Sequence, residues 1–268
     1  MNELMQNKGE AVRLLVCKRQ STLNANSFEI IWRAVVGLGL SVLVIAALTI
    51  NAHAQQTVFN VPTTDVLDKG KVYFELDISA KPNDTTALNH FSSFVTRLVV
   101  GTGHNIEVGL NVIGNVQPGP DATTLVPAFK LRVYNGKDNG WAVVVGDHVF
   151  IPVHNRAYNV ADHAYVITQK TFSTKTRVGF GGGVFTKNVV AANASRGVGM
   201  FTFEQPITKK LNWNADWFTG KHASGYFTTG AAYKLTNKLT GVAAYSIGNA
   251  NASKGNHFLY FELGYNFN

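Results

Sequence analysis

Charged residues and cysteine are both scarce in this sequence. Asp, Glu, Lys and Arg make up only 15% of its 268 residues, whereas an average soluble domain has about 25%. A disordered chain combines low hydrophobicity with high net charge, so a weakly charged chain that is 46% hydrophobic is not of that class. The single cysteine excludes a disulfide scaffold. The lack of a sustained heptad or Gly-X-Y repeat excludes a coiled coil and a collagen.

The sequence also lacks a cluster of basic residues and a nucleotide-binding motif. Lys and Arg outnumber Asp and Glu by 24 to 16, but they are scattered, and nucleic-acid binding requires them on one face. The glycine-rich stretch 179–183 is followed by Val184-Phe185-Thr186, not by the Lys-Ser/Thr of a phosphate loop. His154, Asp162 and His163 could meet in one loop, although polar residues are common in loops. We therefore expect no nucleic-acid partner, no cofactor and no metal.

The first 54 residues have the pattern of an export signal. A basic region precedes an unbroken apolar run from Ala34 to Ile50, and Ala52-His53-Ala54 has the small-x-small form of a cleavage site after Ala54. The alternative is a retained membrane helix, since the 17 residues of the apolar run are at the lower limit for crossing a bilayer. Cleavage would remove Cys17, the only cysteine.

Beyond residue 70 the dominant hydrophobic period is two, which is the period of a β-strand. KVYFELDISA at 71–80 and IEVGLNVI at 106–113 both alternate apolar with polar side chains. We predict strands at 71–80, 91–100, 106–115, 123–134, 141–150, 164–173, 177–186, 197–205, 211–219, 224–235, 239–248 and 257–267. Most have the length that a tilted strand needs to cross a bilayer. The sequence therefore predicts an all-β fold, an antiparallel transmembrane β-barrel of about 12 strands over residues 71–268, with residues 55–70 as a periplasmic lead-in.

Two features favour a membrane barrel over a soluble one, which would bury its apolar face. The connections tend to alternate between short turns and longer loops, as in outer-membrane barrels. Charges also stand in mid-strand on the polar face, and their sign alternates along the first four segments: Glu75 and Asp77, Arg97, Glu107, then Lys130 and Arg132. Neighbouring strands could pair these charges inside a hydrated lumen. The alternative is the solvated face of an ordinary sheet.

Aromatic residues gather near both ends of the segments, as expected of two girdles at the membrane–water boundaries. One group comprises Tyr134, Trp141, Tyr233, Tyr265 and Phe267, and the other comprises Phe150, Trp217, Phe218, Tyr226, Tyr245 and Phe258.

The last segment, FELGYNF at 261–267, alternates apolar and aromatic residues. In this it resembles the outer-membrane β-barrel proteins of Gram-negative bacteria, among them small porin-like or uptake barrels. Those proteins typically finish in such a strand, whose final aromatic residue is recognised by the barrel-assembly machinery. The resemblance implies an outer-membrane location and assigns the assembly signal to Leu263, Tyr265 and Phe267. Asn268 follows the final aromatic residue, which is a departure from the pattern.

We interpret the barrel as a channel or porin-like passage for small polar solutes, and not as an enzyme. Twelve strands enclose a lumen between that of a filled eight-stranded barrel and that of an open sixteen-stranded porin. The residues expected to line the pore are Glu75, Asp77, Arg97, Glu107, Lys130, Arg132, Asn212, Asn214 and Asp216. The expected partners are membrane lipid, the export and barrel-assembly machinery, and small polar solutes.

Two alternatives remain open. A closed structural or adhesive barrel would act through its outer loops, where Arg156 and Tyr158 are the best candidates for contacts. A lipid hydrolase or acyltransferase at the outer rim would use Ser195, Ser224 or Ser253 with a loop histidine. The sequence has no Gly-x-Ser-x-Gly motif to support the enzyme.

Overall fold

A computed structural model describes residues 57–80, 91–114, 123–153, 160–186, 195–222, 224–249 and 257–267. The predicted signal peptide, residues 1–54, lies outside the described residues, as do Arg156, Tyr158, Ser253 and His154. In the part of the chain that the structure describes, no helix is long and apolar enough to cross a membrane.

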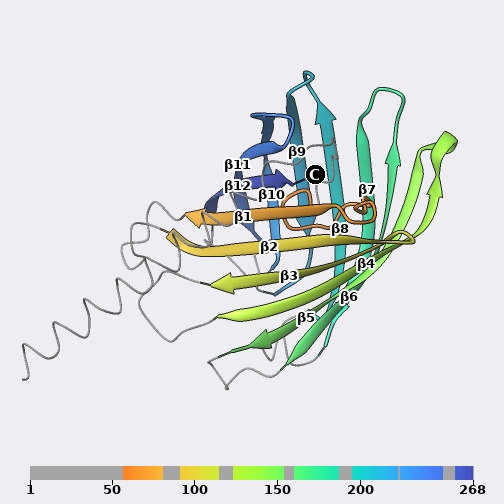
Figure 1. Cartoon of the computed structure of the whole chain (residues 1–268). Helices are drawn as coiled ribbons and strands as arrows, with labels where there is room; N and C mark the ends of the chain where they lie inside the picture. The colour runs from red at the N-terminus through yellow and green to blue at the C-terminus, as the bar shows by residue number, and fades with distance from the viewer. Residues whose placement is uncertain are drawn as a thin grey trace, which may run out of the picture. The chain divides into compact units, whose positions relative to one another are not determined.

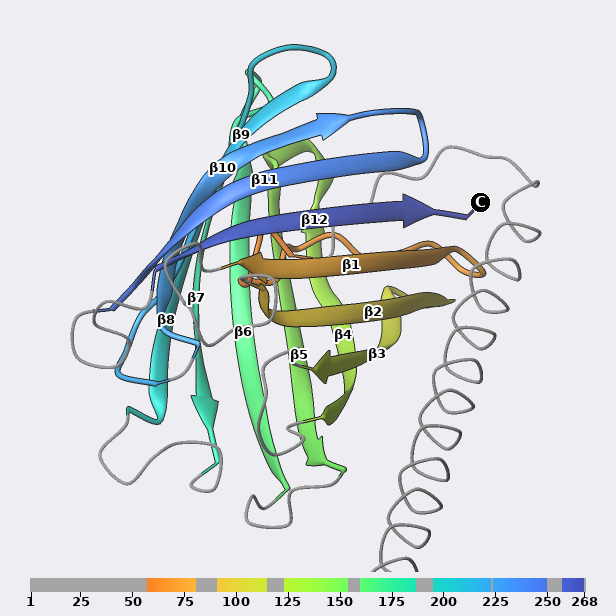
Figure 2. The ribbon, with the colours of Figure 1, turned by 90° about the vertical axis from the view of Figure 1, so that its left-hand side faces the viewer.

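Twelve antiparallel strands form one closed barrel (Figures 1 and 2). They are β1 (Val72–Ala80), β2 (Phe91–Gly103), β3 (Ile106–Gly114), β4 (Thr124–Gly136), β5 (Trp141–Pro152), β6 (Ala161–Thr171), β7 (Arg177–Phe185), β8 (Gly197–Pro206), β9 (Leu211–Phe218), β10 (Tyr226–Lys234), β11 (Leu239–Gly248) and β12 (Phe258–Asn266). Each strand pairs with the next, and β1 pairs with β12 to close the ring. The predicted fold class and strand number are confirmed.

Short turns join the strands at one end of the barrel, which we call the turn end, and longer connections lie at the other, the loop end. In the β2–β3 turn, His104 and Asn105 both have positive φ, 53° and 61°, as a tight hairpin with a primed turn requires. Gly140, with φ 70°, ends the 3₁₀ turn 137–139 between β4 and β5. The first strand begins and the last strand ends at the turn end.

The two faces of the barrel have opposite polarity. Large apolar side chains stand on the outside, for example Leu110, 44% exposed, and Phe129, 45% exposed. Glu107 and Lys130, each next in sequence to an outward-facing neighbour, are buried inside. Burying charge inside while exposing large apolar side chains suits only a barrel that is surrounded by lipid. The barrel therefore spans a membrane.

A segment of the chain occupies the lumen. Residues 57–68, which we call the luminal segment, precede β1 and lie inside the ring of strands (Figure 1). Val58, Phe59 and Val61 are at most 1% exposed. The sequence predicts a periplasmic lead-in here, whereas the structure places these residues within the barrel. The change has a physical reason, because five apolar residues of this segment pack against apolar side chains of the interior wall and so leave water.

Candidate functional site

The interior wall contains most of the residues that the sequence assigns to a pore. Glu75, Asp77, Glu107, Lys130, Asn214 and Asp216 are all buried, and Arg97 lies with them in the lumen. Asn212 lines a cavity at the turn end. Arg132 lies beside the β2–β3 turn, where its Nη2 donates to Asn105 Oδ1 at 3.0 Å. The alternation along each strand thus brings seven of the nine to the middle of the lumen.

Charges on neighbouring strands form pairs across the wall. Glu75 is opposite Arg97 in the register of β1 and β2, and their Oε1 and Nη1 atoms are 2.5 Å apart. Glu107 is opposite Lys130 in β3 and β4, with 2.9 Å between Oε1 and Nζ. The predicted charge pairing is confirmed for these two pairs. The strand register alone therefore positions these ion pairs.

Asp216 holds the tip of the luminal segment. Its Oδ2 accepts hydrogen bonds from the backbone N–H groups of Phe59, Asn60 and Val61 at 3.0, 2.6 and 2.8 Å. These three N–H groups face the carboxylate because the chain turns between Val58 and Val61, where the Val58 N–H donates to the Val61 carbonyl oxygen. Consecutive N–H groups that converge in this way form an anion-binding nest. One buried carboxylate therefore accepts hydrogen bonds from three consecutive backbone donors.

Other wall side chains bind the rest of the luminal segment. Gln169 Oε1 accepts from the Thr64 hydroxyl at 2.8 Å. Glu107 Oε2 accepts from the Leu67 N–H at 2.9 Å, while its other oxygen pairs with Lys130. The residues expected to line a free pore thus bind an inserted segment in this conformation.

Two more contacts involve cations of the wall. Arg97 Nη1 donates to Thr57 Oγ1 at 2.9 Å. Lys130 Nζ donates to the Thr63 carbonyl oxygen at 3.3 Å. Both cations therefore bridge a wall carboxylate and the luminal segment.

Apolar side chains of the luminal segment pack against apolar parts of the same wall. Val61 and Val66 belong to a cluster with Val144, Tyr165, Ile167, Phe185, Val198, Met200 and Phe218. Val58 and Phe59 join Ala232, Val242, Ala244, Phe258 and Tyr260, and Leu67 packs with Tyr73 and Val99. The interior is therefore part core and part polar site.

Sequence reasoning missed a second polar cluster near the turn end. Arg177 Nη1 contacts Asp65 Oδ2 at 2.8 Å and Glu204 Oε2 at 3.3 Å. Its Nη2 donates to Gln169 Oε1 at 2.6 Å, and Gln169 Nε2 donates to Glu204 Oε1 at 2.7 Å. The alternation of side chains along a strand could have revealed such residues, because Gln169 lies on the same face of β6 as the buried His163 and Tyr165.

Glycines make room for this filled interior. Gly181 and Gly183 of β7 face Ile167 and His163, and a Cβ at either position would collide with those side chains. This explains the glycine-rich stretch 179–183 as a wall that lets bulky neighbours approach its backbone.

A cavity of about 420 Å³ lies on the loop-end side of the luminal segment. Phe150, Phe218, Tyr226 and Phe258 line it, together with Phe59, Phe185, Tyr260, His148 and His163. The expectation that the first four belong to an outer aromatic girdle is wrong. They share strand parity with lumen residues, as Phe218 does with Asp216, so they point inward. Trp217 and Tyr245, of opposite parity, are exposed on the outside as expected.

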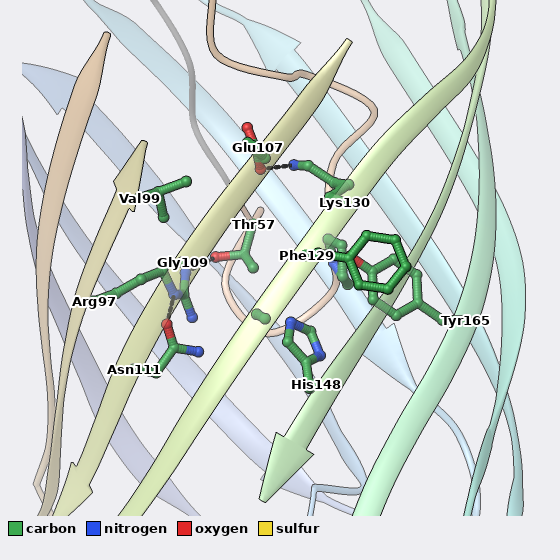
Figure 3. Close-up of a pocket in the computed structure, with 12 residues that line it drawn as sticks. Thr57, Arg97, Val99, Glu107, Gly109, Asn111, Phe129, Lys130, His148 and Tyr165 are labelled. Atoms are coloured by element: carbon green, nitrogen blue, oxygen red, sulfur yellow. Dashed lines mark hydrogen bonds and ion pairs between the residues drawn. The ribbon is translucent and has the colours of Figure 1, made fainter. Parts of the chain in front are cut away.

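A second cavity, of about 160 Å³, lies at the turn end and is lined largely by polar residues, including Asp65, Arg177, Glu204, Lys210, Lys234 and Glu262. It shares no lining residue with the loop-end cavity. A third and smaller cavity, of about 40 Å³, lies beside β2–β5 (Figure 3). Its walls include Arg97, Asn111 and His148, which also line the loop-end cavity. The luminal segment thus separates the two larger cavities.

The rim residues of the enzyme alternative make other contacts. Ser195 Oγ accepts from the Lys221 N–H at 3.1 Å. His222 Nε2 lies 2.6 Å from the Thr219 carbonyl oxygen, and burial lowers the pKa of its imidazole. Asp162 and His163 are adjacent in β6 and therefore point to opposite faces of the wall, so these two cannot bind one metal ion.

The proposed assembly signal lies in and just after β12. Leu263 points outward, 47% exposed, whereas Phe267 is only 7% exposed. The Phe267 ring meets the Tyr265 ring edge-on, with 5.0 Å between centroids.

No family model and no curated protein matches the chain. Several solved structures are similar in fold. An outer membrane channel from Pseudomonas putida F1 has a TM-score of 0.50 and 12% identity, covering 76% of this chain and 98% of that chain. The KdgM porin in complex with disordered oligogalacturonate has a TM-score of 0.46 and 8% identity, with 74% and 98% covered. The translocator domain of the autotransporter NalP from Neisseria meningitidis has a TM-score of 0.41 and 12% identity, with 76% and 90% covered.

At this identity the first match concerns the fold alone. Together with the closed ring of strands, the apolar exterior and the ion-paired interior, it shows that the chain has the fold of an outer-membrane β-barrel.

Proposed function

We propose that the barrel is a channel for small polar solutes and that the luminal segment closes it in the conformation described. One observation carries the proposal. The polar wall residues in the middle of the lumen bind residues 57–67 through their side chains, so the obstruction is a tethered piece of chain and not the wall itself. Withdrawal of that piece would join the cavities on its two sides.

The connection of the luminal segment to the wall supports a movable closure. The segment reaches β1 through Gly70, whose φ of 78° suits glycine. The backbone pairing with β2 starts at this glycine: the Gly70 N–H donates to the Gly101 carbonyl oxygen, and the Gly101 N–H donates to the Lys71 carbonyl oxygen. Strand pairing thus fixes the chain from residue 70 onward, whereas wall side chains hold the residues before it.

A permanently closed structural barrel is the second candidate. The packing of Val58, Phe59 and Val61 in apolar clusters favours it, because withdrawal would expose these side chains. Burial of each such side chain stabilises the closed state by about 1.5–3 kcal/mol. The candidates therefore differ in whether residues 57–68 leave the lumen.

A reversible crosslink distinguishes them. Asn60 Nδ2 donates to Thr228 Oγ1 at 3.3 Å, so cysteines at these positions face each other. The chain after Cys17 contains no cysteine, which gives the double variant Asn60→Cys, Thr228→Cys a clean background. The purified barrel is reconstituted in planar bilayers and measured after linkage with a short cleavable bis-thiol reagent, and again after reduction.

We expect discrete current steps in the reduced double variant and their loss after linkage, with both single-cysteine variants unaffected by the reagent. Steps that persist after linkage would show that conduction does not require the luminal segment to move. If neither wild type nor the reduced variant conducts, the closed structural barrel is the better account.

A further inference from the structure

The loop-end cavity has aromatic walls on two sides. Strands β5, β6, β7 and β9 contribute His148, Phe150, His163, Phe185 and Phe218. Across the cavity, β10 and β12 contribute Tyr226, Phe258 and Tyr260, and the luminal segment adds Phe59. Within each wall the rings are packed, as His163 and Phe185 are, with centroids 4.4 Å apart. These rings hold each other in place around a space of about 420 Å³.

The third wall is polar and comes from β1–β3. Asp77 is 6% exposed, and its Oδ1 is a buried oxygen that has no hydrogen-bond partner among the described residues. Its other oxygen is 4.0 Å from Arg97 Nη2. Asn111 Oδ1 already accepts from Arg97 Nε at 3.2 Å. The hydroxyl groups of Ser79 and Ser93 complete this wall.

The charge behind the polar wall is not positive. One carboxylate oxygen from each of Glu75, Asp77 and Glu262 lies within 4.8 Å of the other two. Arg97 is the cation beside them. Three carboxyl groups face one guanidinium, so the cluster is negative or, with shared protons, neutral. An anionic solute would meet no unpaired cation in this cluster, whereas the buried Asp77 Oδ1 is an acceptor that has no hydrogen-bond partner among the described residues.

We propose that the loop-end cavity binds small amines that have an aromatic or apolar body. The ammonium group would pair with the Asp77 carboxylate, and the body would lie among the rings of the two aromatic walls. Aromatic faces also attract a cation directly, by about 0.5–2 kcal/mol. The volume suits a molecule of one or two rings, since ligand cavities range from about 300 to 1,000 Å³.

The assignment of this site to a transported solute rests on the channel proposed above. Binding itself is measured without current, so the two proposals can fail separately. Binding without conduction would leave a receptor-like closed barrel, and conduction without binding would leave an unselective pore.

Three probes of one shape test the charge preference: benzylamine, benzyl alcohol and benzoate. Each is titrated calorimetrically into the purified whole barrel in detergent micelles, with empty micelles as the blank. Benzyl alcohol can also donate a hydrogen bond to the Asp77 carboxylate, but only the ammonium of benzylamine brings a positive charge to it. We therefore expect benzylamine to bind at least about tenfold more tightly than benzyl alcohol. Benzoate should bind most weakly. Preferred binding of benzoate, or binding of none of the three, overturns the proposal.

Three variants locate the site. Asp77→Asn keeps the size of the side chain and removes its charge, so it should abolish the preference for benzylamine over benzyl alcohol. Phe258→Leu removes one ring of the wall and should weaken both probes severalfold. Phe227→Leu is the matched control, because Phe227 of β10 also lies at the loop end of the barrel but is 39% exposed on the outside. If Phe227→Leu weakens binding as much as Phe258→Leu, or if neither interior variant changes it, the amine binds elsewhere and the proposal is wrong.

Discussion

The two ends of the lumen differ in chemistry although one ring of strands builds both. The turn-end cavity is lined largely by charged residues, and the central one, Arg177, is paired with Asp65 and Glu204. The loop-end cavity is larger, about 420 against 160 Å³, and is walled by aromatic rings with a carboxylate oxygen left without a partner. Satisfied charges fix a structure, whereas unfilled space between rings leaves room for a ligand. The turn end is therefore built for stability and the loop end for binding.

The luminal segment separates the two cavities and makes both polar and apolar contacts with the wall of the barrel. Its backbone N–H groups meet carboxylate and amide oxygens, as in the Asp216 nest, and its side chains meet apolar surface, as Val61 does. A chain segment buried without strand pairing needs both kinds of partner. A mixed polar and apolar interior is thus what an inserted segment requires.

The largest expected effect comes from removing the separation between the two ends. Asp216→Ala deletes the acceptor of three backbone N–H groups, each bond contributing about 1.5–3 kcal/mol. The loss favours withdrawal of the luminal segment, so the time-averaged current in planar bilayers should rise at least about tenfold.

Asp216→Asn is the matched control for that experiment. It retains one oxygen acceptor at nearly the same volume, so its current should lie between those of the wild type and Asp216→Ala. Equal currents in all three proteins would mean that the nest does not hold the channel closed.

The next effect tests the structural role of the turn end. Arg177→Met leaves Glu204 buried without its cation, and breaking a buried pair costs about 3–5 kcal/mol. Because the Arg177 side chain keeps 19% of its exposure, we expect the lower part of that range, about 3 kcal/mol less free energy of unfolding. Urea titration, with the folded fraction read from gel migration, measures it. Arg132→Met is the control: it removes an exposed hydrogen bond to Asn105 and should cost less than about 1 kcal/mol. Similar costs for both variants would contradict the comparison.

The smallest effect is expected at the loop end. Phe258→Leu trims a ring that already borders a cavity, so it creates little new void and should cost only about 1 kcal/mol in the same titration. A loss as large as that of Arg177→Met would mean that the rings serve as core and not as the wall of a binding site.

Much of the barrel follows from the local pattern. Period-two alternation predicts the twelve strands, and the predicted boundaries differ from the observed ones by about three residues at most, as at the start of β6. The sign alternation from Glu75 to Lys130 predicts the two ion pairs, because residues on neighbouring strands of a hairpin meet in register. The same alternation also predicts which aromatic residues point inward, which the girdle interpretation overlooked: Phe258 lies on the same face of β12 as Glu262.

The sequence by itself determined the strand pattern, the apolar exterior and the local charge pairs, since each depends on neighbours in one strand or one hairpin. Only the tertiary structure decided what fills the lumen. Residues 57–68 have no period, and the partners of the nest lie 155–157 positions away in the chain. Closure of the ring brings Asp216 next to Phe59. As a result, the residues predicted to line an open pore hold a segment of the chain inside the barrel.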